Sequence, residues 1–292
     1  MNENNTVTRT SGEAIARLQE QRNAAGKSML FVLLGAFFLI IPPIGLLLIF
    51  IGYQKVQRAR REMPALYKDA FVREPLMNNF ENVTYEPNRG FSEENVKNFG
   101  LCLTANRFWS EDYINATYQG VNFEVAEVNV VDVDTSSDST RSETYFEGRM
   151  MVFHFPNKLV SSVSVFSKKF KHRALSRREA KETEVELESM QFNNIFDVYS
   201  LTQQDAFYLI TPHFMERLQL LADKYQSIAM RVVGNQVILA FNEPGKKIFD
   251  QNVEVGKLDI DQEMAKVQGE IDDIKIFISM ILNLKLYGGT MM

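Results

Sequence analysis

A long uncharged apolar segment constrains the fold of this chain more than any other feature of its sequence. Residues 28–54 contain no charged side chain, and the stretch from Met29 to Tyr53 is almost entirely apolar. A helix of that length covers about 37 Å, which exceeds the roughly 30 Å hydrocarbon core of a bilayer. Because secretory signals have shorter apolar cores, we expect the segment to be retained as an N-terminal transmembrane anchor.

Two prolines near the centre of this segment leave two topologies open. Pro42 and Pro43 lack backbone donors, so they predict a kink in a single membrane-spanning helix. The alternative is a re-entrant hairpin that turns at the prolines. Its arms, residues 29–41 and 44–53, are shorter than the roughly 17 residues that a span requires, so the hairpin would enter only one leaflet. We favour the single kinked span.

Basic residues near the segment predict its orientation. They are more frequent after it than before it: Arg17, Arg22 and Lys27 precede the segment, and Lys55, Arg58, Arg60, Arg61 and Lys68 follow it. Since basic flanks stay in the cytoplasm, we expect the large C-terminal region there, and a hairpin would give the same result. The lone Cys102 excludes an internal disulfide, which agrees with a reducing compartment.

The rest of the chain predicts an α+β fold in successive regions. Runs rich in Val, Phe, Tyr and Thr indicate strands, and apolar spacings of three and four indicate helices. In chain order we expect an N-terminal tail with a short helix (1–27), the transmembrane segment (28–54), a helical stalk (55–108), a β-rich module (109–167), a charged linker (168–183), an α+β module (184–258) and a long C-terminal helix (259–292).

Local signals place three elements within these regions. Ser92 is a typical N-cap and predicts a helix that continues to Leu103. Thr211 followed by Pro212 predicts the start of a second helix. Gly234-Asn235 lies between two β-rich runs and predicts a hairpin.

An apolar stripe runs along the predicted C-terminal helix at alternating spacings of four and three. Its members are Ile260, Met264, Val267, Ile271 and Ile274, followed by Ile278 and Ile281. Such a stripe either docks on the domain of its own chain or forms a seam with a protein partner or a second copy. We favour docking, and both alternatives stay open.

A basic run in the charged linker is the most distinctive charged surface that the sequence predicts. Its members are Lys168, Lys169, Lys171, Arg173, Arg177 and Arg178. In a protein tethered to a membrane, each such residue near anionic lipid headgroups contributes roughly 1 kcal/mol of attraction. The alternatives are contact with an acidic partner and a plain solvated linker.

Several chemistries lack their residue patterns. The net charge of −5, from 32 basic and 37 acidic residues, argues against a nucleic-acid partner. No phosphate-binding glycine loop, zinc-binding spacing or serine-nucleophile motif occurs in the sequence. A stretch from Asp132 to Glu143 has acidic spacing like that of a calcium loop, but Ser137 stands at its glycine position. We therefore assign no catalytic residue, metal or cofactor.

Two stretches of the sequence resemble a known family. Residues 191–200, read QFNNIFDVYS, and residues 205–218, read DAFYLITPHFMERL, are similar to an uncharacterised bacterial membrane-anchored family classified as a domain of unknown function. The similarity extends from about Tyr113 to the end of the terminal helix. It implies a bacterial source, and it assigns no catalytic residues to this chain.

These features favour a binding function at the bacterial inner membrane. We expect a membrane-anchored cytoplasmic adaptor or regulatory binding module, with the lipid bilayer and a protein partner or second copy as its contacts. The alternative is an unrecognised enzyme that acts on membrane or envelope-linked substrates. A deep pocket that gathers a histidine with two carboxylates would favour the enzyme, and a shallow groove would favour binding.

Overall fold

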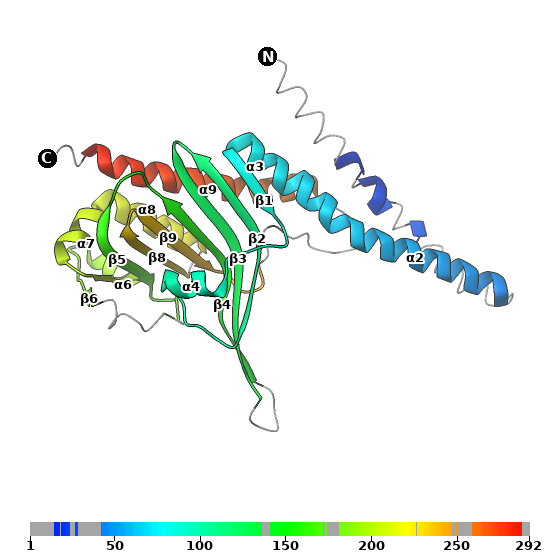
Figure 1. Cartoon of the computed structure of the whole chain (residues 1–292), viewed down its shortest axis with the longest axis horizontal. Coiled ribbons are helices and arrows are strands. Elements are labelled where there is room, and N and C mark those ends of the chain that lie inside the picture. The colour runs from blue at the N-terminus through cyan, green and yellow to red at the C-terminus, as the bar shows by residue number, and fades with distance from the viewer. Residues whose placement is uncertain are drawn as a thin grey trace, which may run out of the picture. The chain divides into compact units, whose positions relative to one another are not determined.

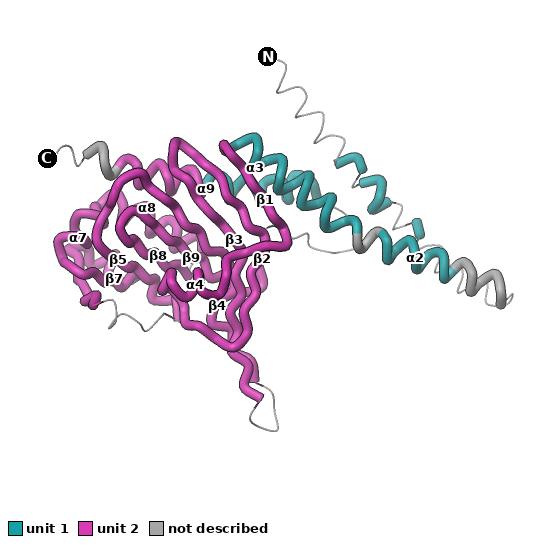
Figure 2. Tube along the Cα trace, viewed as in Figure 1, with its two compact units in different colours: residues 1–79, 247–272 teal, residues 80–246, 273–292 magenta. Residues whose placement is uncertain are grey.

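The chain forms two units in a computed structural model. The structure describes residues 15–17, 19–23, 27–28, 42–135, 141–171, 173, 181–225, 227–246, 249 and 259–287. Unit 1 comprises residues 1–79 and 247–272, and unit 2 comprises residues 80–246 and 273–292 (Figure 2). The helix α9 (Ile260–Tyr287) contributes residues to both units.

Unit 1 is helical. Helix α2 (Pro42–Tyr67) continues through Pro64, and a π-helical segment (Lys68–Arg73) and α3 (Glu74–Asn79) follow it directly. Tyr67 is fully buried, and its ring stacks on that of Phe71 with 5.0 Å between the ring centroids. The Tyr67 hydroxyl donates a hydrogen bond to the Glu263 carboxylate. The helical stalk predicted over residues 55–108 is a continuous helical run only as far as Asn79, and strand β1 (Glu81–Glu86) lies in the remainder.

The predicted membrane anchor lies partly outside the described residues. Residues 29–41 are not described, and α2 begins at Pro42. None of the helices that the structure describes is long and apolar enough to cross a membrane. The anchor, the kink at Pro42 and Pro43, and the choice between span and hairpin stay predictions.

Unit 2 is built on one antiparallel sheet (Figure 1). Its nine strands follow the order β1-β2-β3-β4-β9-β8-β5-β7-β6. The strands are β1 (Glu81–Glu86), β2 (Arg107–Tyr118), β3 (Val121–Asp134), β4 (Arg141–His154), β5 (Val160–Ser167), β6 (Thr183–Glu184), β7 (Phe196–Ser200), β8 (Ile228–Gly234) and β9 (Gln236–Asn242). The helices of this unit are α4 (Glu93–Phe99), α6 (Met190–Ile195), α7 (Gln203–Leu209), α8 (Pro212–Tyr225) and the second part of α9.

The two faces of the sheet pack against different helices. On one face Phe153 meets Phe277 of α9 at 5.0 Å between ring centroids, and Phe241 meets Tyr225 of α8 at 4.4 Å. On the other face, α4 lies against the sheet (Figure 1). It contributes Val96 to a buried apolar cluster there. Because successive strand residues point to opposite faces, β4 and β9 supply side chains to both cores.

The strands expected in separate modules lie together in this sheet. Strand β4 of the predicted β-rich module pairs with β9 of the predicted α+β module, and β5 pairs with both β8 and β7. Antiparallel pairing between strands about 90 residues apart leaves no local mark on the sequence, since a strand's composition does not identify its neighbour. The α+β class and the C-terminal helix are confirmed.

The predicted caps and hairpin are confirmed, with one correction. Ser92 accepts a hydrogen bond from the Asn95 amide at 3.1 Å, and the Thr211 hydroxyl accepts one from the Phe214 amide at 3.4 Å. Strands β8 and β9 form the predicted hairpin. The helix after Ser92 ends at Phe99, so the prediction that it reaches Leu103 is wrong. Gly100 adopts a left-handed φ of +66° and terminates it.

Candidate functional site

The strongest candidate site in the described chain is a cavity of about 320 Å³ on the face of the sheet that α4 partly covers. We call it the sheet pocket. Its lining comes from one helix and four strands: Asn95, Asn98 and Phe99 of α4, Glu124 of β3, Val152 and His154 of β4, Arg231 and Val233 of β8, and Gln236 and Ile238 of β9. All of these residues belong to unit 2.

Strand register brings these distant residues together. One row across the sheet pairs Glu124 with Val152, Val152 with Ile238, and Ile238 with Arg231. The next row pairs His154 with Gln236 and Gln236 with Val233. Paired residues of antiparallel strands lie on the same face. The pocket therefore has an apolar floor with a charged group at each end of one row.

The first charged end is a hydrogen-bonded chain of three side chains. The Nε2 atom of His154 lies 3.4 Å from Oε1 of Glu124, and its Nδ1 atom lies 3.4 Å from the amide nitrogen of Gln236. Because the Gln236 amide nitrogen can only donate, this contact fits Nδ1 of His154 as the acceptor and Nε2 as the donor to Glu124. The hydrogen bond to His154 is the main cause that lowers the pKa of Glu124, against the raising effect of burial.

Two further residues influence the same carboxylate. Tyr113 and Arg89 both lower the pKa of Glu124, to a smaller extent than His154 does. In turn, the pKa of Tyr113 is raised, first by burial and then by the charge of Glu124. Arg89 forms its own ion pair with Glu86 at 2.5 Å. Glu124 is therefore held ionised at neutral pH while its side chain stays 26% exposed.

The second charged end is the guanidinium of Arg231. Its Nη1 atom donates to the carbonyl oxygen of Phe99 at 3.3 Å, and its Nη2 atom lies 3.7 Å from Oε1 of Glu182. The carboxylate of Glu182 is 1% exposed and accepts hydrogen bonds from the hydroxyls of Ser162 and Ser164. Within the described chain, no acceptor lies within hydrogen-bond distance of the buried Nε atom of Arg231.

This arrangement can bind a ligand through its apolar floor and the charged groups at its two ends. Among the described residues that line the pocket, Glu124 is the only carboxylate. The pocket thus holds a histidine with one carboxylate. The pattern that would favour an enzyme site is a histidine with two carboxylates. The lining residues are spread along the sequence between Asn95 and Ile238, and no spacing motif connects them. Sequence reasoning missed the pocket because only the strand register brings its residues together.

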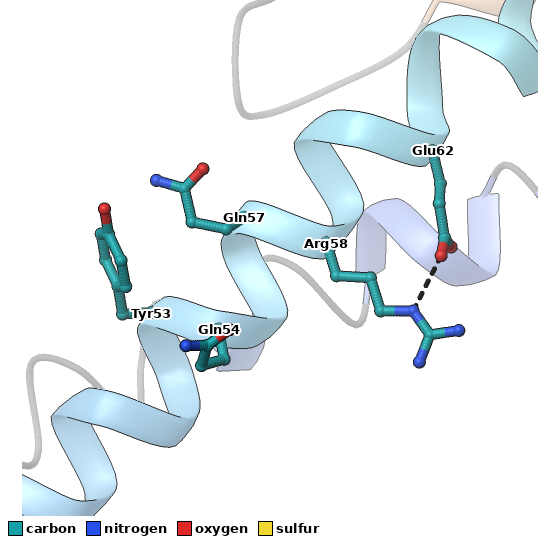
Figure 3. Close-up of a pocket in the computed structure, with 5 residues that line it drawn as sticks. All are labelled: Tyr53, Gln54, Gln57, Arg58 and Glu62. Carbon is teal, nitrogen blue, oxygen red and sulfur yellow. Dashed lines mark hydrogen bonds and ion pairs between the residues drawn. The ribbon is translucent and has the colours of Figure 1, made fainter.

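A second hollow lies along α2 in unit 1 (Figure 3). Its volume is about 540 Å³, and Tyr53, Gln54, Gln57, Arg58 and Glu62 line it. The Nε atom of Arg58 lies 2.7 Å from Oε1 of Glu62, so the two charges satisfy one another. Their hydrogen bond raises the pKa of Arg58 and lowers that of Glu62. One helix supplies every lining residue, so this hollow is a surface groove and a weaker candidate.

A group of three acids appears where the sequence predicted no metal. Carboxylate oxygens of Glu111, Asp112 and Glu127 lie within 4.8 Å of one another, a spacing at which they could hold a cation. Asp112 is fully buried, adopts a left-handed φ of +58°, and accepts a hydrogen bond of 2.5 Å from the hydroxyl of Tyr85. All three acids have further interactions within the protein.

The predicted basic run divides into a packed part and a part outside the described residues. Arg173 forms an ion pair with Asp197 and donates to the carbonyl oxygens of Phe170 and Ser167 at 3.0 and 3.1 Å. Lys168 lies 3.9 Å from the same Asp197. Lys169 and Lys171 are exposed. Arg177 and Arg178 lie outside the described residues, so a lipid contact of this run stays a prediction.

The predicted seam on α9 is mostly buried. Val267, Ile271 and Ile274 are at most 2% exposed, whereas Met264 is 40% exposed and Ile260 is half-buried. This pattern supports docking of the stripe within the chain. The part of the stripe that a partner could reach is therefore the beginning of α9, up to Met264.

The second half of the chain matches a protein family of unknown function. Residues 144–286 match the family model described as "Protein of unknown function (DUF3137)". No curated protein matches the chain. Among solved structures, a crystal structure of the mycobacterial trehalose monomycolate transport factor A, TtfA, is 11% identical, with a TM-score of 0.38 and coverage of 72% of this chain and 93% of that one. That TM-score does not establish a common fold. The match of residues 144–286 to this family model agrees with the resemblance to an uncharacterised domain family that the sequence showed.

Proposed function

We propose that this protein is a membrane-anchored regulatory binding module whose sheet pocket receives a small ligand. The observation that supports this proposal is the construction of the pocket from four strands with continuous backbone pairing. Side chains on a rigid sheet are held in place before a ligand arrives, which lowers the entropic cost of binding. An open cavity with an apolar floor and a few polar groups is typical of ligand sites.

The membrane part of this proposal rests on the sequence. The apolar segment 28–54 is long enough for one span, and the basic residues that follow it favour a cytoplasmic sheet domain. A sheet domain carried by an anchor would report ligand binding at the membrane to a protein partner. This is the adaptor role that the sequence favoured, and ligand binding in the sheet pocket would regulate it.

A stability measurement tests the binding function without knowledge of the ligand. Purified full-length protein is melted with and without a small-molecule extract of the cells that produce it. A ligand that binds only the folded state stabilises it and so raises the Tm. At a ligand concentration about one hundred times the Kd, the stabilisation is about 2.7 kcal/mol. Val233→Trp, which fills the pocket from an exposed position on β8, is expected to abolish the rise.

A matched variant controls for the added tryptophan. Leu220 is 58% exposed on α8, which packs on the opposite face of the sheet, so Leu220→Trp is expected to keep the full rise in Tm. Mass spectrometry of molecules that co-purify with the wild type but not with Val233→Trp then identifies the ligand. An equal rise in both variants, or none in the wild type, would contradict binding in the sheet pocket.

A further inference from the structure

The Arg231 end of the sheet pocket has unused capacity for an anion. Its guanidinium is 19% exposed and donates to one carbonyl, that of Phe99. The separation of 3.7 Å from Glu182 is longer than a hydrogen bond. Both oxygens of that carboxylate already accept from Ser162 and Ser164. A carboxylate in the pocket would therefore gain charge-assisted hydrogen bonds from the remaining N–H groups of Arg231.

The Glu124 end has the opposite preference. Its carboxylate is partly exposed, and the hydrogen bond from His154 is the main cause that lowers the pKa of Glu124. The nearby Arg89 is paired with Glu86 and compensates only part of the charge. An ammonium group is the ligand group that this end favours, since it supplies three donors and a positive charge.

The distance between the two ends limits the size of the ligand. Glu124 and Arg231 are three strand spacings apart in one row, which puts their Cα atoms roughly 14 Å from each other. Their side chains occupy part of that span. A dipeptide covers at most about 7 Å along its backbone. The cavity of about 320 Å³ is close to the lower size limit of ligand pockets, which excludes a large occupant.

Amide side chains stand along the same span. Asn95 and Asn98 of α4 and Gln236 of β9 line the same pocket as its two charged ends. Each offers both a donor and an acceptor, which is what a peptide group requires. An inorganic anion would be repelled by Glu124, and a simple cation would be repelled by Arg231.

We infer that the sheet pocket binds a small zwitterion of amino-acid to dipeptide size, with its carboxylate at Arg231 and its ammonium group at Glu124. This inference rests on the proposed binding function and names the chemical class of its ligand. The apolar floor formed by Val152 and Ile238 accommodates a small apolar side chain.

Methyl NMR on the full-length protein tests the inference. The methyl groups of Val152 and Ile238 report on the pocket floor, and the probe is L-alanyl-L-alanine. Acetate and ethylammonium serve as probes with one charged end each. We expect a saturable shift of both methyl signals with the dipeptide and at most a weak shift with either single-ended probe.

Two matched carboxylate-to-amide variants give the control. Glu124→Gln removes the charge at the ammonium end and is expected to raise the Kd for the dipeptide about tenfold, the size of one charge-assisted hydrogen bond. Glu94→Gln makes the same change at an exposed position of α4 that does not line the pocket, and it is expected to leave the Kd unchanged. Dispersed methyl spectra confirm that both variants are folded.

Each contrary result has a separate meaning. Equal shifts with acetate or ethylammonium alone, or equal Kd values for the two variants, would overturn the zwitterion and leave the binding function in place. Absence of a shift with every probe would also overturn it. If the cell extract still raises the Tm of the wild type and not of Val233→Trp, the pocket binds another class of ligand. If the extract also fails, the binding function itself is wrong.

Discussion

At the scale of single residues, a buried ion pair on the opposite face of the sheet makes the removal of either partner costly. Arg149 is 2% exposed and pairs with Glu243, which is 9% exposed, and its guanidinium lies 5.1 Å from the ring centroid of Tyr225. Arg149→Met leaves a buried carboxylate with less compensation, so we expect a loss of about 3–5 kcal/mol in the free energy of unfolding. Urea denaturation followed by circular dichroism measures it. The matched change Arg89→Met removes an exposed pair with Glu86, and its loss should be much smaller. Equal losses in the two variants would contradict this assignment.

At the scale of elements, the C-terminal cap of α4 connects the helix to the sheet pocket. Gly100 adopts a φ of +66°, and a Cβ atom there would lie 2.2 Å from Nη1 of Arg231. Gly100→Ala is therefore expected to cost about 1–2 kcal/mol for the left-handed backbone and, in addition, to displace the guanidinium from Phe99. Gly120→Ala is the control, because Gly120 has a φ of +74° with nothing within 4 Å of its Cβ position. Both variants should lose stability in urea, but only Gly100→Ala should shift the Ile238 methyl signal. A shift of that signal in both would show that backbone strain, not Arg231, is responsible.

Elements with a local signal could be predicted from the sequence, and their arrangement in the sheet could not. The caps at Ser92 and Thr211 and the hairpin at Gly234 depend on residues within four positions of each other, which the sequence shows directly. The pocket depends on the register between β3, β4, β9 and β8. His154 and Glu124 each lie in an ordinary strand run, and only pairing across the sheet makes them neighbours.

At the scale of the whole molecule, the membrane anchor predicted from the sequence can be tested by extraction. The uncharged segment 28–54 predicts that the full-length protein stays with membranes after alkaline extraction, because a span buries far more apolar area than a peripheral contact does. Deletion of residues 29–53 should release it.

A single span places the two termini on opposite sides, whereas a hairpin at Pro42 and Pro43 places both in the cytoplasm. Protease digestion of intact bacterial spheroplasts should therefore remove an N-terminal tag and spare a C-terminal one. Protection of both tags would establish the hairpin, and loss of the C-terminal tag would overturn the cytoplasmic location of the sheet domain.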